Sequence, residues 1–223
     1  MGQIAFTELR RLMLKVIAAH AQVSSEMTGR AVLDPRVVEV MGEVPRHEFV
    51  PEEYQAYAYE DGPLPIGHDK TISQPFIVAL MVDLLDLDDN DTVLEVGTGL
   101  GYQAAVLSRL VSKVYTMDIM EDLATDAVDR LKDLAGYDNV EVRIGNGYYG
   151  WLDYAPFDKI IVAAAPEHIP SPLVEQLKPG GRMVLPLGTL DDQQLVVVEK
   201  DRAGDVETHQ VLPVRFAQLV IAH

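Results

Sequence analysis

Three glycines that follow a short apolar segment carry the clearest chemical signal in the chain. Residues 92–96 (TVLEV) are mostly apolar or β-branched, which predicts a buried parallel strand, and Gly97, Gly99 and Gly101 follow it. Glycine adopts φ > 0 without strain and has no Cβ, so the backbone can lie against a ligand at the N-terminus of the next helix. Residues 102–111 carry apolar side chains at helical spacing. The segment therefore predicts a strand, turn and helix that bind a nucleotide-like ligand.

The spacing of these glycines decides which ligand fits. A dinucleotide fingerprint, G-x-G-x-x-G, would need its third glycine at position 102, where the chain has Tyr102. A Walker loop would close with Gly-Lys and then Ser or Thr, and this turn has no such ending. The remaining pattern is E-x-G-x-G-x-G, from Glu95 to Gly101, and it resembles the first motif of S-adenosylmethionine-dependent methyltransferases. The loop therefore favours S-adenosylmethionine over NAD or a nucleoside triphosphate.

An acidic residue further along supports the same interpretation. The segment 113–118 predicts the next strand and ends in Asp118, which lies 118 − 97 = 21 positions after the first glycine. Nucleotide-binding folds place the carboxylate that holds ribose hydroxyls at about this distance. An Asp that merely ends a strand is the alternative, and the agreement between the loop and the strand pattern favours the ribose role.

Composition excludes several classes of function. The 223 residues carry a net charge of −17, so we expect no nucleic-acid surface, because phosphate contacts need clustered Lys and Arg. The acidic excess permits a salty cytosol or basic partners without requiring either. The chain has no cysteine, and His68, Asp69 and His168 lack ligand spacing, so we expect no metal. No apolar stretch approaches membrane-spanning length, and we expect a cytoplasmic monomer that binds no membrane.

The element pattern predicts an α/β fold with a doubly wound, mostly parallel, Rossmann-like sheet. We predict helices over residues 7–20, 35–41, 73–85, 102–111, 123–134 and 171–177. We predict strands over residues 92–96, 113–118, 139–144, 157–163, 182–187, 194–199 and 208–216, with a turn at 178–181. Residues 45–65 mix prolines with aromatics and predict an irregular cap over the sheet. We therefore expect an N-terminal helical and cap region, 1–74, and a cofactor-binding domain, 75–223, in one compact unit. The order of the last strands is not readable.

Several separate segments resemble protein-L-isoaspartate O-methyltransferases. They are HEFVPEEY (47–54), AYEDGPLPIG (58–67), TISQP (71–75), EVGTGLGYQAAVL (95–107), IIVAAAPEHIP (160–170), KPGGRMVLPLG (178–188) and PVRF (213–216). Many methyltransferases share the glycine loop, whereas TISQP and VRF are far more diagnostic. The resemblance implies an enzyme of EC class 2.1.1 that repairs damaged proteins by methylating their L-isoaspartyl carboxylates. That carboxylate is already ionised near neutral pH, so the reaction needs alignment more than a strong base.

The resemblance also assigns roles to residues. Ser73 corresponds to the active-site hydroxyl, and the substrate would be held by Thr71, Ile72, Ser73 and Arg215. The cofactor would be held by Glu95, Gly97, Thr98, Gly99, Gly101, Tyr102, Gln103, Asp118, Asn146 and Gly147. Ser73 could instead be the N-cap of the helix that Pro75 opens, or serve both roles. Arg215 could instead be an ordinary surface arginine.

Two positions depart from the family pattern. Asn146 stands between two glycines where the family often has an Asp that meets the adenine, and Asn still offers a donor and an acceptor. Asp69 and Lys70 precede TIS where many bacterial members have Gly-Gln. Two alternatives to isoaspartyl repair therefore remain open. One is a relative that methylates another carboxylate, such as one on a peptide natural product, and the other is a non-catalytic cofactor-binding protein.

Overall fold

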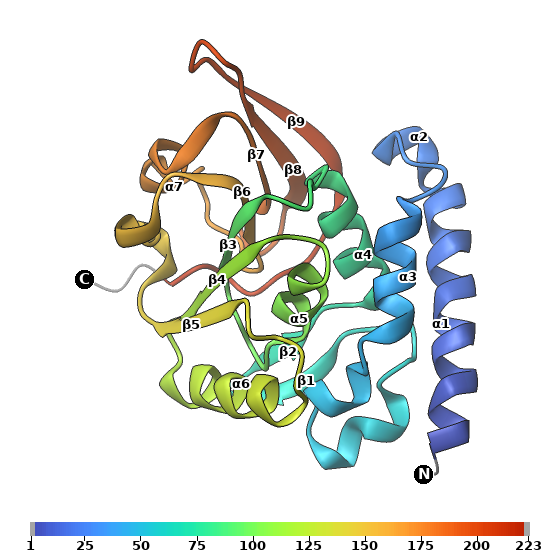
Figure 1. Cartoon of the computed structure of the whole chain (residues 1–223). Coiled ribbons are helices and arrows are strands. Elements are labelled where there is room, and N and C mark those ends of the chain that lie inside the picture. The colour runs from blue at the N-terminus through green and yellow to red at the C-terminus, as the bar shows by residue number, and fades with distance from the viewer. Residues whose placement is uncertain (1–2, 221–223) are drawn as a thin grey trace.

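A seven-stranded sheet forms the centre of the computed structural model, which describes residues 3–220 (Figure 1). The strands lie in the order β5-β4-β3-β6-β7-β8-β9; β3 to β7 are parallel, whereas β8 and β9 each run antiparallel to the strand before. Their bounds are β3 (Thr92–Val96), β4 (Lys113–Asp118), β5 (Val140–Ile144), β6 (Phe157–Val162), β7 (Leu177–Gly188), β8 (Gln193–Lys200) and β9 (Val206–Pro213). The predicted Rossmann-like α/β fold is confirmed.

Successive side chains along a strand point to opposite faces of the sheet, and both faces are buried at its central strands. In β3, Val93 belongs to one core cluster, whereas Leu94 and Val96 belong to another. The first cluster packs against α4 (Pro75–Leu84), α5 (Tyr102–Ser108) and α6 (Glu121–Asp133). The second packs against α7 (Ser171–Glu175), with Trp151 between the short turns η3 (Gly147–Tyr149) and η4 (Leu152–Tyr154). The apolar run at residues 160–162 of β6 is typical of this two-sided burial.

The N-terminal helices form a further layer outside α4. Figure 1 shows α1 (Gln3–Val23) as the outermost helix, with α3 (Pro35–Glu43) between it and the sheet, and the short α2 (Ser25–Thr28) follows α1. Met13 and Ile17 bury one face of α1. Asp34 accepts a hydrogen bond from the backbone N–H of Arg36 at 2.8 Å, which confirms the predicted cap of α3. No helix in the range 3–220 has the length and apolar character to cross a membrane.

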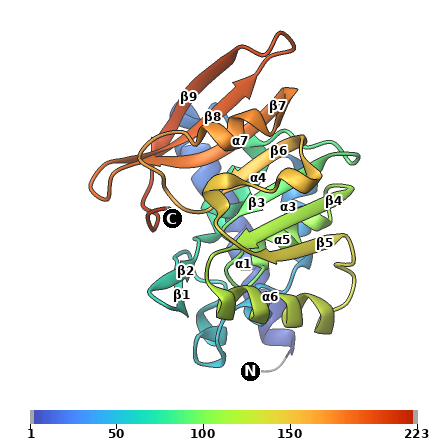
Figure 2. The same ribbon diagram turned by 90° about the vertical axis from the view of Figure 1, so that its left-hand side faces the viewer.

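The predicted irregular cap consists of short turns and a hairpin. Two 3₁₀ turns, η1 (Arg46–Phe49) and η2 (Glu52–Tyr57), lead into β1 (Leu64–Gly67) and β2 (Lys70–Ile72). The two residues that join these strands, His68 and Asp69, have φ of 52° and 55°, as a type I′ turn requires. Figure 2 shows the hairpin at the end of the molecule toward which the arrow of β4 points.

Some element boundaries differ from the sequence predictions. Residues 178–181 were predicted as a separate turn, but they lie within β7, where its pairing with β6 shifts register between Phe157 and Lys159. The strand predicted over 208–216 ends at Pro213, and α5 ends at Ser108. The helix predicted to begin at Ser73 begins at Pro75.

Candidate active site

A cavity of about 850 Å³ opens at the carboxyl ends of the parallel strands. Segments that follow β3, β4, β5 and β6 line one side, and the hairpin, residues 71–74 and residues 213–220 line the rest. The chain leaves β3 toward β4 and β5 and then returns to β6 on the other side of β3. Ligands of open α/β sheets bind at such a switch point, and this volume is typical of a cofactor site.

The glycine loop lines this cavity. Gly97 and Gly99 have φ of 96° and 54°, which disfavours other residue types. A Cβ on Gly97 would lie 3.3 Å from Ala163 Cβ, and one on Gly99 would lie 3.1 Å from Ile66 Cδ1. The loop is therefore confined between the end of β6 and the hairpin, so that its bare backbone faces the cavity.

Asp118 lies on the cavity wall and holds the glycine loop in place. One carboxylate oxygen accepts the N–H of Gly99 at 2.9 Å, and the other accepts the N–H of Met120 at 2.9 Å. Each carboxylate oxygen has a second lone pair, so Asp118 retains the capacity to accept hydrogen bonds from a diol. The predicted ribose-binding position is thus also a structural link between β3 and β4.

Glu95 lies beneath the loop and does not line the cavity. Its side chain is fully buried and accepts a hydrogen bond from the Thr116 hydroxyl at 2.6 Å, and Thr116 lies 2.6 Å from the Thr98 hydroxyl. Burial raises the pKa of Glu95 to about 8, although the Thr116 hydrogen bond acts in the opposite direction. Glu95 therefore supports the loop from below and carries a proton at neutral pH.

Two more of the predicted cofactor residues lie off the cavity wall. Gly101 caps α5 with φ of 91° and packs toward α6, where an added Cβ would lie 3.4 Å from Leu131. Asn146 caps η3, and its side-chain oxygen accepts the N–H of Tyr148 at 3.1 Å. The other predicted cofactor residues line the cavity: Gly97, Thr98, Gly99, Tyr102, Gln103, Asp118 and Gly147.

Thr71, Ile72 and Ser73 line the same cavity. The N-cap interpretation of Ser73 is wrong, because Pro75 occupies the first helical position and the cap position falls on Gln74. The Ser73 hydroxyl makes no hydrogen bond with the rest of the described chain. Its backbone carbonyl, however, accepts a hydrogen bond from a buried side chain.

Arg46 fixes it. This fully buried guanidinium donates to the carbonyls of Ala58 and Ser73, each at 2.7 Å, and lies 4.9 Å above the Tyr102 ring. Burial lowers the pKa of Arg46 to about 10, so it stays charged at neutral pH. Arg46 thus links Ser73, through the hydrogen bond to its carbonyl, to α5, through the contact with the Tyr102 ring. Its buried charge is compensated by carbonyl oxygens instead of a carboxylate.

Among residues 3–220, four charged residues line the cavity, and two of them are cationic: Asp69, Lys70, Asp118 and Arg215. Arg215 follows the end of β9, and Lys70 begins β2, so separate elements bring them to one cavity. Neither cation makes a hydrogen bond or ion pair within residues 3–220. In a chain with 35 Asp and Glu against 18 Lys and Arg, two unpaired cations in one cavity indicate a site for an anion.

Comparison with known proteins identifies the family. A sequence model described as protein-L-isoaspartate(D-aspartate) O-methyltransferase matches residues 19–222. The chain belongs to this family. A protein named protein-L-isoaspartate O-methyltransferase 2, from Syntrophobacter fumaroxidans, is 56% identical over 215 residues, which cover 96% of this chain and 87% of that protein. A protein named protein-L-isoaspartate O-methyltransferase 1, from a Polaromonas species, is 56% identical over 96% of this chain and 90% of its own length.

Solved structures agree with this assignment. A structure named protein-L-isoaspartate O-methyltransferase has a TM-score of 0.81 and 28% identity over 94% of this chain, which spans 65% of that longer chain. A putative protein-L-isoaspartate O-methyltransferase from Plasmodium falciparum, in complex with S-adenosyl-L-homocysteine, has a TM-score of 0.78 and 21% identity. The alignment covers 96% of this chain and 98% of that one, and it shows that the two share a fold.

Sequence reasoning did not anticipate part of the cavity wall of this methyltransferase-family chain. Ile119, Met120 and Leu123 follow Asp118 and form an apolar face, which the apolar pair after the acidic residue could have signalled. Residues 216–220 reach the wall because Ala165 N–H donates to Ala217 and Leu219 N–H donates to Ala165, at 2.8 and 2.9 Å. Such a tertiary contact leaves no local sequence signal.

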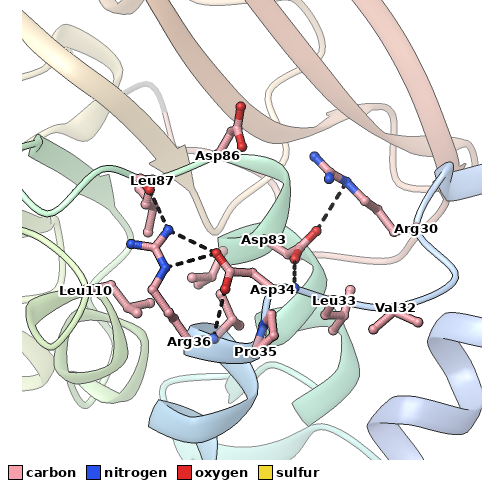
Figure 3. A pocket seen from close by; sticks show the side chains of 12 residues that line it. Arg30, Val32, Leu33, Asp34, Pro35, Arg36, Asp83, Asp86, Leu87 and Leu110 are labelled. Atoms are coloured by element: carbon pink, nitrogen blue, oxygen red, sulfur yellow. Dashed lines mark hydrogen bonds and ion pairs between the residues drawn. The ribbon is translucent and has the colours of Figure 1, made fainter.

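A second, smaller cavity of about 310 Å³ lies between residues 30–37 and the end of α4 (Figure 3). Four of its charged side chains form two pairs: Arg30 lies 3.2 Å from Asp83, and Arg36 lies 2.9 Å from Asp34. Burial raises the pKa of Asp83. The Arg30–Asp83 pair joins the N-terminal region to α4, whereas the Arg36–Asp34 pair lies at the start of α3. We assign no ligand to the cavity. No group of three or more His, Cys, Asp or Glu that could hold a metal ion occurs among residues 3–220.

Proposed function

We propose that this chain is an S-adenosylmethionine-dependent carboxyl O-methyltransferase that acts on L-isoaspartyl residues of damaged proteins. One observation carries the proposal: the glycine loop, Asp118 and the Ser73 segment all line the same cavity. A cofactor and an acceptor carboxylate can therefore meet there. Family membership supports the same reaction.

The residues of the cavity fit S-adenosylmethionine. A Cβ on Gly97 or Gly99 would crowd Ala163 or Ile66, so the loop has only its backbone at these positions, and Asp118 has lone pairs for ribose hydroxyls. We propose that Ile119, Met120 and Leu123 contact the base, with Gly147 and Asn146 near it, and that Thr98, Tyr102 and Gln103 complete the cofactor site. Glu95 and Gly101 would act indirectly, by supporting the loop. When bound, S-adenosylmethionine supplies a methyl group on an electrophilic sulfonium centre.

The acceptor side needs orientation more than acid or base chemistry. The isoaspartyl carboxylate is ionised near neutral pH, so no residue must remove a proton from it. We propose that the Ser73 hydroxyl donates to that carboxylate and that Arg215 attracts it, with Thr71 and Ile72 beside them. The buried Arg46 keeps the Ser73 backbone in place. Holding the reacting groups in line supplies most of the catalysis.

Lys70 supports a second candidate function. This chain has Asp69 and Lys70 where the resemblance implies Gly-Gln, and both residues line the cavity. A second cation there suits an acceptor with an additional negative charge, such as a different peptide carboxylate. We rank this second, because the 56% identical relatives named as isoaspartyl methyltransferases cover most of the chain.

We also propose that the protein is a cytoplasmic monomer without nucleic-acid or membrane partners. The net charge of −17 repels phosphate backbones and anionic lipid headgroups. Damaged proteins would be its macromolecular partners, and their isoaspartyl residues would enter the cavity.

The proposal is tested with S-adenosylmethionine labelled in its methyl group and a synthetic isoaspartyl peptide. We expect label in the peptide as a base-labile ester that releases labelled methanol at alkaline pH. Cofactor binding without any label transfer would support a non-catalytic relative instead.

A further inference from the structure

Gln74 follows Ser73 and is another polar residue that lines the cavity. It occupies the N-cap position of α4, and its backbone carbonyl accepts the N–H of Val78 at 3.1 Å. Its side chain makes no capping hydrogen bond. The amide is therefore not required to complete the helix.

Asp61 fixes the orientation of that amide. Gln74 Nε2 donates to Asp61 Oδ1 at 2.9 Å, and an ionised carboxylate only accepts hydrogen bonds, so the amide nitrogen must face it. The polar atom left for a ligand is Oε1, which has no hydrogen-bond partner in the described part of the chain. Gln74 thus offers the cavity an acceptor.

Asp61 is in turn positioned by α1. Its second oxygen, Oδ2, lies 2.6 Å from His20 Nε2, and the His20 ring stacks on Phe76 with 5.1 Å between centroids. Both oxygens of Asp61 are therefore engaged, one by α1 and one by the residue beside Ser73. This arrangement restricts rotation of the Gln74 amide.

We propose that Gln74 determines specificity by accepting, through Oε1, the backbone N–H of the isoaspartyl residue whose carboxylate Ser73 holds. In an isoaspartyl residue the free carboxylate and the N–H are attached to the same carbon, whereas in aspartate one methylene separates the carboxylate from that carbon. Ser73 and Gln74 are adjacent, with Cα atoms about 3.8 Å apart. Together they bind a carboxylate and an N–H that are attached to the same carbon. They do not fit an aspartyl residue, in which a methylene separates the carboxylate from the carbon that carries the N–H. This inference rests on the proposed function and names the feature of the substrate that the site recognises.

The test compares two isoaspartyl peptides, one with its natural N–H and one in which an ester oxygen replaces that N–H. We expect the wild-type enzyme to methylate the ester analogue with a kcat/KM about three- to tenfold lower, the range for one lost neutral hydrogen bond. Gln74→Met should lower kcat/KM for the natural peptide by a similar factor and methylate both peptides equally well. Gln210→Met, the same substitution on β9 away from the cavity, should behave as wild type.

Asp61→Asn provides a second route that leaves Gln74 in place. An Asn side chain can donate as well as accept, so the amide of Gln74 loses its fixed orientation and the preference for the N–H peptide should shrink. In the double variant with Gln74→Met, Asp61→Asn should cause no further change in that preference. Equal use of both peptides by wild type, or an unchanged preference in Gln74→Met, would overturn the inference. Absence of methylation of either peptide by wild type would refute the proposed function itself.

Discussion

Ser73 is held by its backbone, while its hydroxyl makes no bond within the described chain. The carbonyl of Ser73 accepts from Arg46, and the helix cap falls on Gln74. We therefore predict that Ser73→Ala changes the free energy of unfolding by less than about 0.5 kcal/mol. Turnover of an isoaspartyl peptide should fall about 10- to 100-fold, because a hydrogen bond to a charged carboxylate contributes about 1.5–3 kcal/mol. Cofactor affinity, measured by calorimetry, should stay nearly unchanged.

Ser73→Asp sharpens this test. The added carboxylate would repel the incoming carboxylate, so the variant should be stable but inactive. Methylation of the isoaspartyl peptide by Ser73→Asp at the wild-type rate would show that Ser73 does not contact the acceptor carboxylate.

Glu95 makes stability depend on pH. Its pKa is raised to about 8 by burial, so between its ordinary value of 4.5 and about 8 the folded state binds more protons than the unfolded state. The free energy of unfolding should therefore fall as pH rises through this window, by a few kcal/mol in order of magnitude. In Glu95→Gln, which can still accept from Thr116, this fall should be much smaller. Chemical denaturation at pH 5.5 and pH 8.5 measures both, and an equal fall in the two proteins would contradict the assignment.

At the scale of elements, the strand, glycine loop and helix from 92 to 108 could be predicted because local sequence determines them. The hairpin over 64–72 could not. Its strands have four and three residues, Pro65 lies within the first, and its turn uses His68 and Asp69 instead of the usual Asn-Gly. Arg215 was predicted within a strand, but β9 ends at Pro213, and tertiary contacts bring the following segment to the cavity.

The glycine loop gives the prediction at this scale. Gly99→Val places a β-branched side chain at φ of 54°, with its Cβ 3.1 Å from Ile66, in the loop that the cofactor is proposed to contact. We expect S-adenosylhomocysteine binding to be abolished while the far-ultraviolet circular dichroism stays that of the wild type, because the strain is confined to the loop. Normal binding of S-adenosylhomocysteine by this variant, measured by calorimetry, would show that the loop assignment is wrong.

At the scale of the whole molecule, the N-terminal region and the sheet share one core. Met13 and Ile17 of α1 belong to the same cluster as Val93 and Val114 of the sheet. We propose that the region 1–74 and the domain 75–223 fold as one unit for this reason. The region 1–74 also supplies the acceptor side of the cavity, because Arg46 and Asp61 hold Ser73 and Gln74 there, whereas the glycine loop and Asp118 belong to 75–223. The sequence predicted both regions, but it could not show that side chains of the first region hold Ser73 and Gln74 beside the cofactor loop of the second.

The central claim is that the protein transfers a methyl group from S-adenosylmethionine to an isoaspartyl carboxylate within this cavity. The most direct measurement compares methyl transfer to an isoaspartyl peptide with transfer to its aspartyl twin of identical sequence, with Gly99→Val as the cofactor-deficient control. The account predicts a base-labile ester on the isoaspartyl peptide alone, and none with the control. Equal methylation of both peptides, or of neither while S-adenosylmethionine binds, would contradict it.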